Sequence, residues 1–453
     1  MKTFPAIICI CSILLLPALS LSADFYVNGA TGNDNNSCTS SDHPCKTIWK
    51  ALDKTPVGTS TIKISKGLQY IEKDLNVPHH HYITFEGGWN NDFTVHENSA
   101  QSTIIETGSK INHDALFNLL ISGSGQWASM TLKNMTLRYK EQSEIKRAIN
   151  ANSTNEAKAW LTLQNVQITK FDQPSDVIET AASGNGVLTI NFNESDFSDN
   201  PGTSQAGFGS TIFRGLTSNE GKLNIIMKKI RINHNGFNSL SNENTLLLWF
   251  ICDGGTLDAT IENSMITGNR SNTVFSLPAN GNSNAKLNII NDTISKNRAP
   301  GTYALNAYAR GNSNLTVNMT NTIFTDNNGS YMYLSQEDSG HLTVNVSHCL
   351  VDSFPQPYTE GGATYTHSDN IDNSLIYWPH LDSRFHLRSG SPAIDAGICG
   401  YWDQSGYQRI APDDDIDGDK RPGLGTYLGC DIGADEYKAF PWPMFLPAII
   451  HGH

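Results

Sequence analysis

The stretch Leu315-Thr-Val-Asn-Met-Thr-Asn-Thr-Ile-Phe-Thr-Asp-Asn327 contains the pattern that decides the fold. Apolar and polar residues alternate from Leu315 to Met319, and Phe324 and Asn327 follow three residues apart. Strict alternation with β-branched residues is typical of a strand and not of a helix. The stretch therefore predicts a short strand followed by a turn that contains Asn.

The same pattern returns along residues 130–352. The clearest copies end in an apolar residue and an Asn three positions later, and these Asn are Asn200, Asn235, Asn269, Asn297 and Asn327. They are separated by 35, 34, 28 and 30 residues. A repeat of this length built from strands predicts stacked coils, and strands that recur in one direction along the stack must pair in parallel. We therefore expect an all-β parallel β-helix solenoid.

Stacked coils align their equivalent residues, so we expect the five Asn to form a vertical structural ladder. Asn suits a tight corner because it tolerates the left-handed backbone, and stacked amides can hydrogen-bond along the ladder. An aromatic column follows six residues after three ladder positions, at Phe275, Tyr303 and Tyr333. We expect it to pack in the core; the alternative is an exposed platform that binds sugar rings.

Composition and the N-terminal segment place the chain outside the cell. An apolar stretch from Ala6 to Leu19 follows Lys2 and precedes Ser20-Leu-Ser-Ala23, which predicts a signal peptide over residues 1–23 and a secreted or cell-surface protein. The 453 residues carry a net charge of −13, which disfavours nucleic-acid partners. No other stretch is long and apolar enough to predict a transmembrane span.

Six cysteines remain after the expected cleavage. In an oxidising compartment the nearest pairs, Cys38 with Cys45 and Cys399 with Cys430, are expected to form disulfides. Cys252 and Cys349 lie within the repeats, where a small buried apolar side chain is the simpler expectation.

The ends of the chain resemble a known group of proteins. Phe25-Tyr-Val-Asn-Gly-Ala-Thr-Gly-Asn-Asp34 and Phe85-Glu-Gly-Gly-Trp89 resemble the N-terminal region of exported bacterial right-handed parallel β-helix proteins of the pectin-lyase-like superfamily. Ser391-Pro-Ala-Ile-Asp-Ala-Gly397 and Asp431-Ile-Gly-Ala-Asp-Glu-Tyr437 are similar to the C-terminal region of choice-of-anchor Q proteins. The resemblance implies a right-handed solenoid and export, but no single reaction.

These features predict five parts. After the signal peptide come an N-terminal cap with the first coils (24–100), the β-helix repeats (101–380), a C-terminal cap (381–437) and an apolar, proline-rich tail (438–453). The N-terminal cap is expected to contain a short helix with Ile48, Ala51 and Leu52 on one face, after Ser41-Asp42 as its N-cap. The C-terminal cap is expected to close the far end of the solenoid.

Two groups of residues could carry chemistry. Asp413, Asp415 and Asp417 match the early positions of a calcium loop, but the twelfth position is Leu424, so an EF-hand is rejected and calcium would need other ligands. Aligning the coils places acidic residues beside basic ones on neighbouring rungs. This candidate catalytic patch is Glu194, Asp196, Lys229, Arg231 and His234.

The patch has two interpretations. Opposite charges on adjacent strands fix the register of neighbouring coils, which is the simpler one. A polysaccharide lyase or glycoside hydrolase could also use such carboxylates and cations. We expect a non-catalytic protein whose lateral face contacts a polysaccharide or a cell surface. The alternatives are an enzyme of those two classes and a purely structural surface component.

Overall fold

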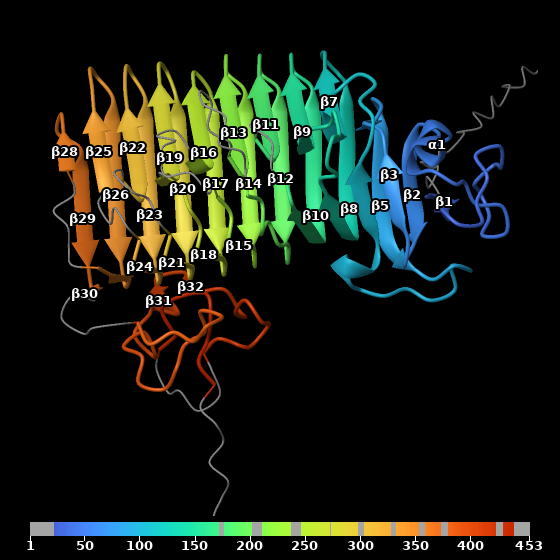
Figure 1. Cartoon of the computed structure of the whole chain (residues 1–453). Coiled ribbons are helices and arrows are strands. Elements are labelled where there is room, and N and C mark those ends of the chain that lie inside the picture. Colours follow the sequence, from blue (N-terminus) through green and yellow to red (C-terminus); the bar gives the residue numbers. More distant parts are fainter. Residues whose placement is uncertain are drawn as a thin grey trace, which may run out of the picture.

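The chain folds into a right-handed parallel β-helix, seen in a computed structural model (Figure 1). The structure describes residues 22–171, 176–201, 211–236, 246–271, 273–297, 303–327, 332–352, 358–372, 379–422 and 429–438. The signal peptide expected over residues 1–23 and the tail expected over 438–453 therefore lie almost wholly outside the described residues. None of the helices in the described ranges is long and apolar enough to cross a membrane.

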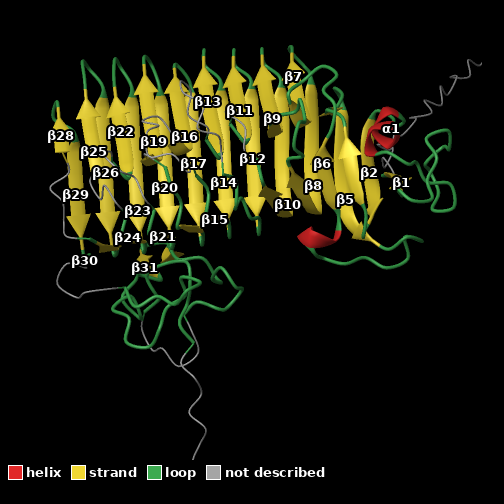
Figure 2. Ribbon diagram, in the orientation of Figure 1, coloured by secondary structure: helices red, strands yellow, loops and turns green. Residues whose placement is uncertain are grey.

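Three parallel sheets build the solenoid, and the third extends only along its C-terminal part, residues 231–372 (Figure 2). The first sheet has fourteen strands: β1 (Ala23–Val27), β2 (Gly58–Ser65), β3 (Gln69–Glu72), β5 (His81–Trp89), β6 (Ile104–Thr107), β8 (Trp127–Arg138), β10 (Lys158–Thr169), β12 (Val187–Asn193), β14 (Lys222–Lys228), β17 (Thr256–Glu262), β20 (Asn284–Ile290), β23 (Asn314–Thr320), β26 (His341–Ser347) and β29 (Thr364–Ser368).

The second sheet has ten strands: β4 (Leu75–Asn76), β7 (Ala115–Ser122), β9 (Arg147–Thr154), β11 (Ile178–Ser183), β13 (Phe213–Ser218), β16 (Leu246–Asp253), β19 (Thr273–Asn280), β22 (Leu305–Ala309), β25 (Met332–Gln336) and β28 (Tyr358–Glu360). The third sheet has six short strands: β15 (Arg231–Asn233), β18 (Met265–Thr267), β21 (Thr293–Ser295), β24 (Ile323–Thr325), β27 (Leu350–Val351) and β30 (Ile371–Asp372).

The alternation in the sequence sets which side chains enter the core. On β23, Leu315, Val317 and Met319 are buried, while the residues between them are more exposed. The register matches equivalent residues of successive coils, so Leu315 pairs with Ala285 and with Leu342. Each coil thus adds one layer to a continuous apolar column inside the solenoid.

The five predicted Asn form a buried amide ladder. In each of four successive steps, the side-chain Nδ2 of one Asn donates to Oδ1 of the Asn in the next coil, at 2.8–3.0 Å. The left-handed backbone was expected at these Asn, and that expectation is wrong. The left-handed residue is the one just before each Asn: Asp199, His234, Gly268, Lys296 and Asp326.

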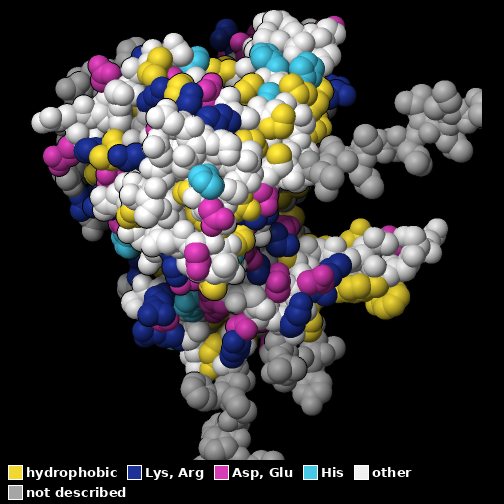
Figure 3. Space-filling model, turned by 90° about the vertical axis from the view of Figure 1, so that its right-hand side faces the viewer, with side chains coloured by type: hydrophobic (Ala, Val, Ile, Leu, Met, Phe, Trp, Pro, Cys, Tyr) yellow, Lys and Arg dark blue, Asp and Glu magenta, His cyan; other side chains and the backbone are white. Residues whose placement is uncertain are grey.

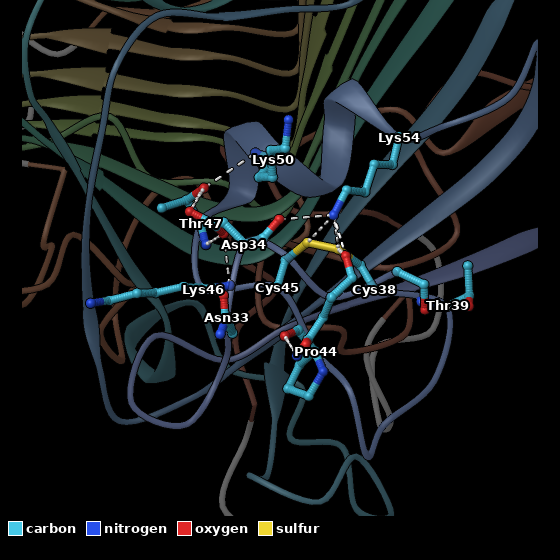
Figure 4. Close-up of a disulfide and its surroundings, with 12 residues drawn as sticks. Asn33, Asp34, Cys38, Thr39, Pro44, Cys45, Lys46, Thr47, Lys50 and Lys54 are labelled. Atoms are coloured by element: carbon cyan, nitrogen blue, oxygen red, sulfur yellow. Dashed lines mark hydrogen bonds between the residues drawn. A yellow bond between two sulfur atoms is a disulfide. The ribbon is translucent and has the colours of Figure 1, made fainter.

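The N-terminal end is closed by a helix and a disulfide. Helix α1 (Ile48–Asp53) buries Ile48, Ala51 and Leu52 as predicted, but its N-cap is Thr47 and not Ser41 or Asp42. The disulfide between Cys38 and Cys45 lies beside α1 (Figure 4).

The first turn of α1 is also held from the solenoid. Glu72 on β3 accepts the backbone N–H of Ile48 at 2.8 Å and that of Trp49 at 3.2 Å. These are two of the amide groups that a helix leaves unpaired at its start.

The C-terminal region, residues 379–438, does not close the far end of the solenoid as expected. It packs on the side of the solenoid against the third sheet, below β15, β18, β21 and β24 in Figure 1. It contains one antiparallel hairpin, β31 (Gly400–Asp403) and β32 (Gly406–Arg409), and the second disulfide, Cys399–Cys430. The last coil itself covers the core end, through Ala363 and Tyr365.

Candidate functional site

The corner between the first and third sheets repeats one left-handed residue in each coil. This corner column consists of Asn134, Asn165, Glu194, Lys229, Asn263, Asn291, Asn321 and His348. Asn is the residue that tolerates this backbone best, and a bulkier side chain costs roughly 1–2 kcal/mol there. Glu194 and Lys229, at φ of 50° and 55°, break the run of Asn in two neighbouring coils. Strain of this kind concentrates at functional sites.

A second column lies two residues further on, along the outer face of the third sheet. Backbone pairing aligns Gln167, Asp196, Arg231, Met265, Thr293, Ile323 and Leu350. The C-terminal region covers the apolar members: Met265 packs with Ile416 and Ala434, and Ile323 and Leu350 pack with Leu387, Ala393 and Ile432. The charged members of the column, Asp196 and Arg231, lie at the edge of the area that the C-terminal region covers.

A cleft of about 390 Å³ opens at that border. Its floor is formed by the two columns, its first wall by the segment around the short helix η1 (Ala100–Ser102), and its second wall by Ile416 of the C-terminal region. The lining residues are Asn98, Ser99, Ala100, Gln101, Asn165, Val166, Gln167, Glu194, Ser195, Asp196, Lys229, Arg231 and Ile416. Four of the five predicted patch residues therefore line one cleft. His234 lies outside it, near Asp199.

The predicted pairing of charges between neighbouring coils holds only for His234, whose Nδ1 is 4.0 Å from Asp199 Oδ1. Lys229 and Arg231 instead pair with the C-terminal region. Lys229 Nζ lies 3.0 Å from Asp414 Oδ2, and Arg231 Nη2 lies 2.9 Å from Asp417 Oδ1. The sequence could not reveal these partners because they are more than 180 residues away.

Asp196 is the most perturbed acid of the cleft. Burial raises its pKa, against the opposing effects of a hydrogen bond from Ser198 and the positive charge of Arg231. Its Oδ1 is shielded from solvent and has no hydrogen-bond partner among the described residues. Glu194, by contrast, is exposed. The cleft therefore holds two carboxyl groups in different environments.

Further hydrogen bonds hold the walls of the cleft to the corner column. Asn134 Nδ2 is 3.2 Å from His96 Nε2 of the first wall. On the other side, Asn291 donates to Asp431 O at 3.0 Å and Asn321 donates to Ile398 O at 2.7 Å. Both covers use the same column of amides, and the cleft lies between them.

The predicted aromatic column divides into two environments. Phe275 is buried in the core, in register with Leu248 and Leu305. Tyr303 and Tyr333 do not continue it. Their ring centroids lie 5.0 Å apart, and Tyr333 stacks on Tyr358 at 5.5 Å, along the solenoid axis. Tyr333 therefore lies between two other rings, and sugar binding by this column stays a prediction.

The three aspartates of the predicted calcium loop have different partners. Asp413 pairs with Arg409 at 2.9 Å, and Asp417 pairs with Arg231. Asp415 is buried and accepts the backbone N–H groups of Asp417 and Asp419, so it shapes the turn. The three carboxylates thus have separate partners, and calcium binding by this region stays a prediction.

The remaining cysteines are buried thiols. Cys252 and Cys349 form no disulfide, and burial raises the pKa of the Cys349 thiol to about 12. They contribute to packing, and neither lines the cleft.

Sequence reasoning missed the polar lining contributed by Gln101, Gln167 and Asn98. One signal was present for the floor: Glu194 and Lys229 replace Asn at equivalent positions of the repeat. The first wall had no such signal, because residues 98–101 lie outside the repeat pattern.

Mixed charge is a feature of the surface as a whole. Figure 3 shows acidic and basic side chains lying next to one another over the lower part of the molecule, with no broad area of one sign.

No protein-family model and no curated protein match the chain. Three solved structures are similar to it at low identity. A pectin methylesterase from Aspergillus niger is 15% identical with a TM-score of 0.36, over 63% of this chain and 89% of that one. A GH136 lacto-N-biosidase from Eubacterium ramulus is 8% identical with a TM-score of 0.34, over 77% and 67%. The A-module of an Azotobacter vinelandii mannuronan C-5 epimerase is 11% identical with a TM-score of 0.26, over 72% and 94%. The fold assignment rests on the strand pairing of this chain alone.

Proposed function

We propose that this protein is exported and binds a neutral polysaccharide in the cleft without cleaving it. The observation that carries the proposal is the lining of the cleft. Amides and hydroxyls of Asn98, Ser99, Gln101, Asn165, Gln167 and Ser195 dominate the lining, which suits the many hydroxyl groups of a sugar chain. Disulfide pairing and the expected signal peptide support export to an oxidising compartment.

Charge favours a neutral sugar over a uronate. Asp414 and Asp417 already neutralise Lys229 and Arg231, the two cations of the cleft. Glu194 and Asp196 have no ion-pair partner within 4.0 Å among the described residues. An acidic polymer would therefore meet unpaired carboxyl groups and no free cation, which is unfavourable.

Binding can be tested with purified residues 24–453 and a panel of neutral and acidic polysaccharides, by affinity electrophoresis and calorimetry. Gln101→Ala and Gln167→Ala each remove hydrogen bonds to the sugar, and we expect each to weaken binding by roughly threefold to tenfold. Thr316→Ala is the matched control, because Thr316 lies on the outer face of β23 away from the cleft. Equal loss of binding in the control, or a preference for acidic chains, would refute the assignment.

Asp196 favours glycoside hydrolysis as a second candidate function. A buried carboxyl group with a raised pKa can act as a general acid, and exposed Glu194 two residues away could act as the base. The same panel is therefore assayed for new reducing ends. We expect none. Release of reducing ends that is lost in Asp196→Asn, with binding retained, would replace the binding proposal with a hydrolase.

A further inference from the structure

Three potential metal ligands converge in the C-terminal region, on segments far apart in sequence. They are His386, Asp417 and Asp435, and one ligand atom of each lies within 4.8 Å of the other two. Asp435 is only 8% exposed, and His386 is also largely buried. Three separate turns therefore place a histidine and two carboxylates around one point.

An ion pair accounts for the contact of His386 with Asp417, but it does not account for Asp435, whose carboxylate lies at the same point. His386 Nε2 lies 2.9 Å from Asp417 Oδ2 and is shielded from solvent, and this contact raises the pKa of the imidazole. A metal ion bound by the three side chains would displace the imidazole proton, because His binds metals in its neutral form.

Each ligand is also oriented by a second partner. Asp435 Oδ2 accepts the backbone N–H of Leu387 at 2.7 Å, and Asp417 Oδ1 pairs with Arg231. Asp382 Oδ2 lies 3.7 Å from His386 Nδ1, the ring nitrogen that faces away from Asp417. Outer carboxylates and backbone groups of this kind orient the ligands in metal sites.

We propose that His386, Asp417 and Asp435 bind one divalent metal ion of the zinc class. A neutral imidazole and two carboxylates offer one nitrogen and two oxygens, a donor set that zinc accepts, and Asp417 would share its charge between the ion and Arg231. Calcium is disfavoured because it takes six to eight oxygen ligands. A water molecule would fill the fourth position from the side of Asp417, the most exposed of the three.

The proposed metal site would be connected to the cleft through Asp417. Asp417 presents one oxygen to the metal position and the other to Arg231 on the cleft floor. Bound metal would therefore fix the turn that carries Ile416, the second wall of the cleft, against the solenoid. The proposal concerns metal binding and does not depend on glycan binding.

Zinc binding is measured on the untagged chain after treatment with EDTA, by calorimetry and by competition with a chromogenic chelator. We expect about one equivalent of zinc, with affinity reduced roughly tenfold or more in His386→Ala and in the nearly isosteric Asp435→Asn. The chain also contains His451 and His453. The double variant His451→Ala/His453→Ala should keep the same stoichiometry and affinity.

A second measurement separates loss of the site from loss of folding. Zinc should raise the thermal unfolding midpoint of the native chain and of the double variant, because it binds the folded state. It should raise that of Asp435→Asn much less. Absence of zinc binding, or binding unchanged in both His386→Ala and Asp435→Asn, would overturn the proposal.

Discussion

The coils of the solenoid and the C-terminal region reach stability by opposite routes. The coils repeat the same small set of contacts: alternating apolar residues inside, parallel backbone pairing to neighbouring coils and, from Asn200 to Asn327, one ladder Asn per coil. The C-terminal region has one short hairpin and depends on contacts that occur once, such as the Arg421–Glu436 pair. A repeat spreads stability over many equivalent residues, whereas an irregular region concentrates it in a few.

The largest expected effect on stability comes from breaking the Arg421–Glu436 pair. Arg421 Nη1 is 2.8 Å from Glu436 Oε2, and both side chains are almost fully buried. Arg421→Ala removes the cation that neutralises the buried Glu436 carboxylate, which costs about 3–5 kcal/mol. We expect the C-terminal region to become sensitive to protease at temperatures where the solenoid stays folded, as followed by limited proteolysis with mass spectrometry.

The control for this variant is Arg310→Ala. Arg310 is exposed and pairs with Glu337 and Asp338, so its loss should cost less than about 1 kcal/mol. A single unfolding transition for Arg421→Ala, with solenoid and C-terminal region lost together, would show that the two regions do not differ in this way.

Replacing one Asn of the buried ladder should have a smaller effect on the free energy of unfolding. Asn269 donates to Ile232 O and Asn297 Oδ1, and it accepts from Asn235. Asn269→Ala removes these bonds and leaves buried polar groups unpaired, so we expect a loss of about 2–3 kcal/mol of unfolding free energy in urea denaturation.

A second amide ladder on the outer face supplies the matched control. Asn318 donates to Asn288 and accepts from Asn345, all partly exposed. Water can replace these bonds, so Asn318→Ala should cost less than about 1 kcal/mol. Equal costs for Asn269→Ala and Asn318→Ala would mean that burial of the ladder contributes nothing to its strength.

The last expected effect appears only when the pH changes, and it concerns the first coil. Burial raises the pKa of Glu72 to about 7, although the N–H groups of Ile48 and Trp49 oppose the shift. Because the folded state holds this proton more tightly than the unfolded chain does, the stability from Glu72 is full below pH 4.5 and falls as the pH rises to about 7. The fall should be at most about 3 kcal/mol.

Glu72→Gln should remove this component of the pH profile while keeping one acceptor oxygen for α1. Unfolding free energies of both proteins are compared from pH 4 to pH 8, and their difference should change over that window. Glu337→Gln, which alters an exposed carboxylate, should leave the profile unchanged. A constant difference between Glu72→Gln and the native chain would contradict the assignment.

The repeated part of the molecule was predictable because its information is local. Alternation fixed the strands, spacing fixed the coils, and the recurring Asn predicted the amide ladder. The left-handed residue was placed one position too late because the sequence shows the ladder Asn clearly but not the variable residue before it, such as His234 or Lys296. Phe275 was grouped with Tyr303 and Tyr333 because spacing alone does not show whether a side chain faces inward.

The sequence by itself determined the parallel β-helix, the ladder and the charged residues at the cleft floor, because each follows from a pattern repeated at short range. Only the tertiary structure decided where the C-terminal region lies and what its acidic residues contact. Asp414 and Asp417 reach Lys229 and Arg231, and Met265 and Ile323 face outward beneath the same cover. These contacts join segments far apart in sequence through unique packing, which no repeat or local periodicity encodes.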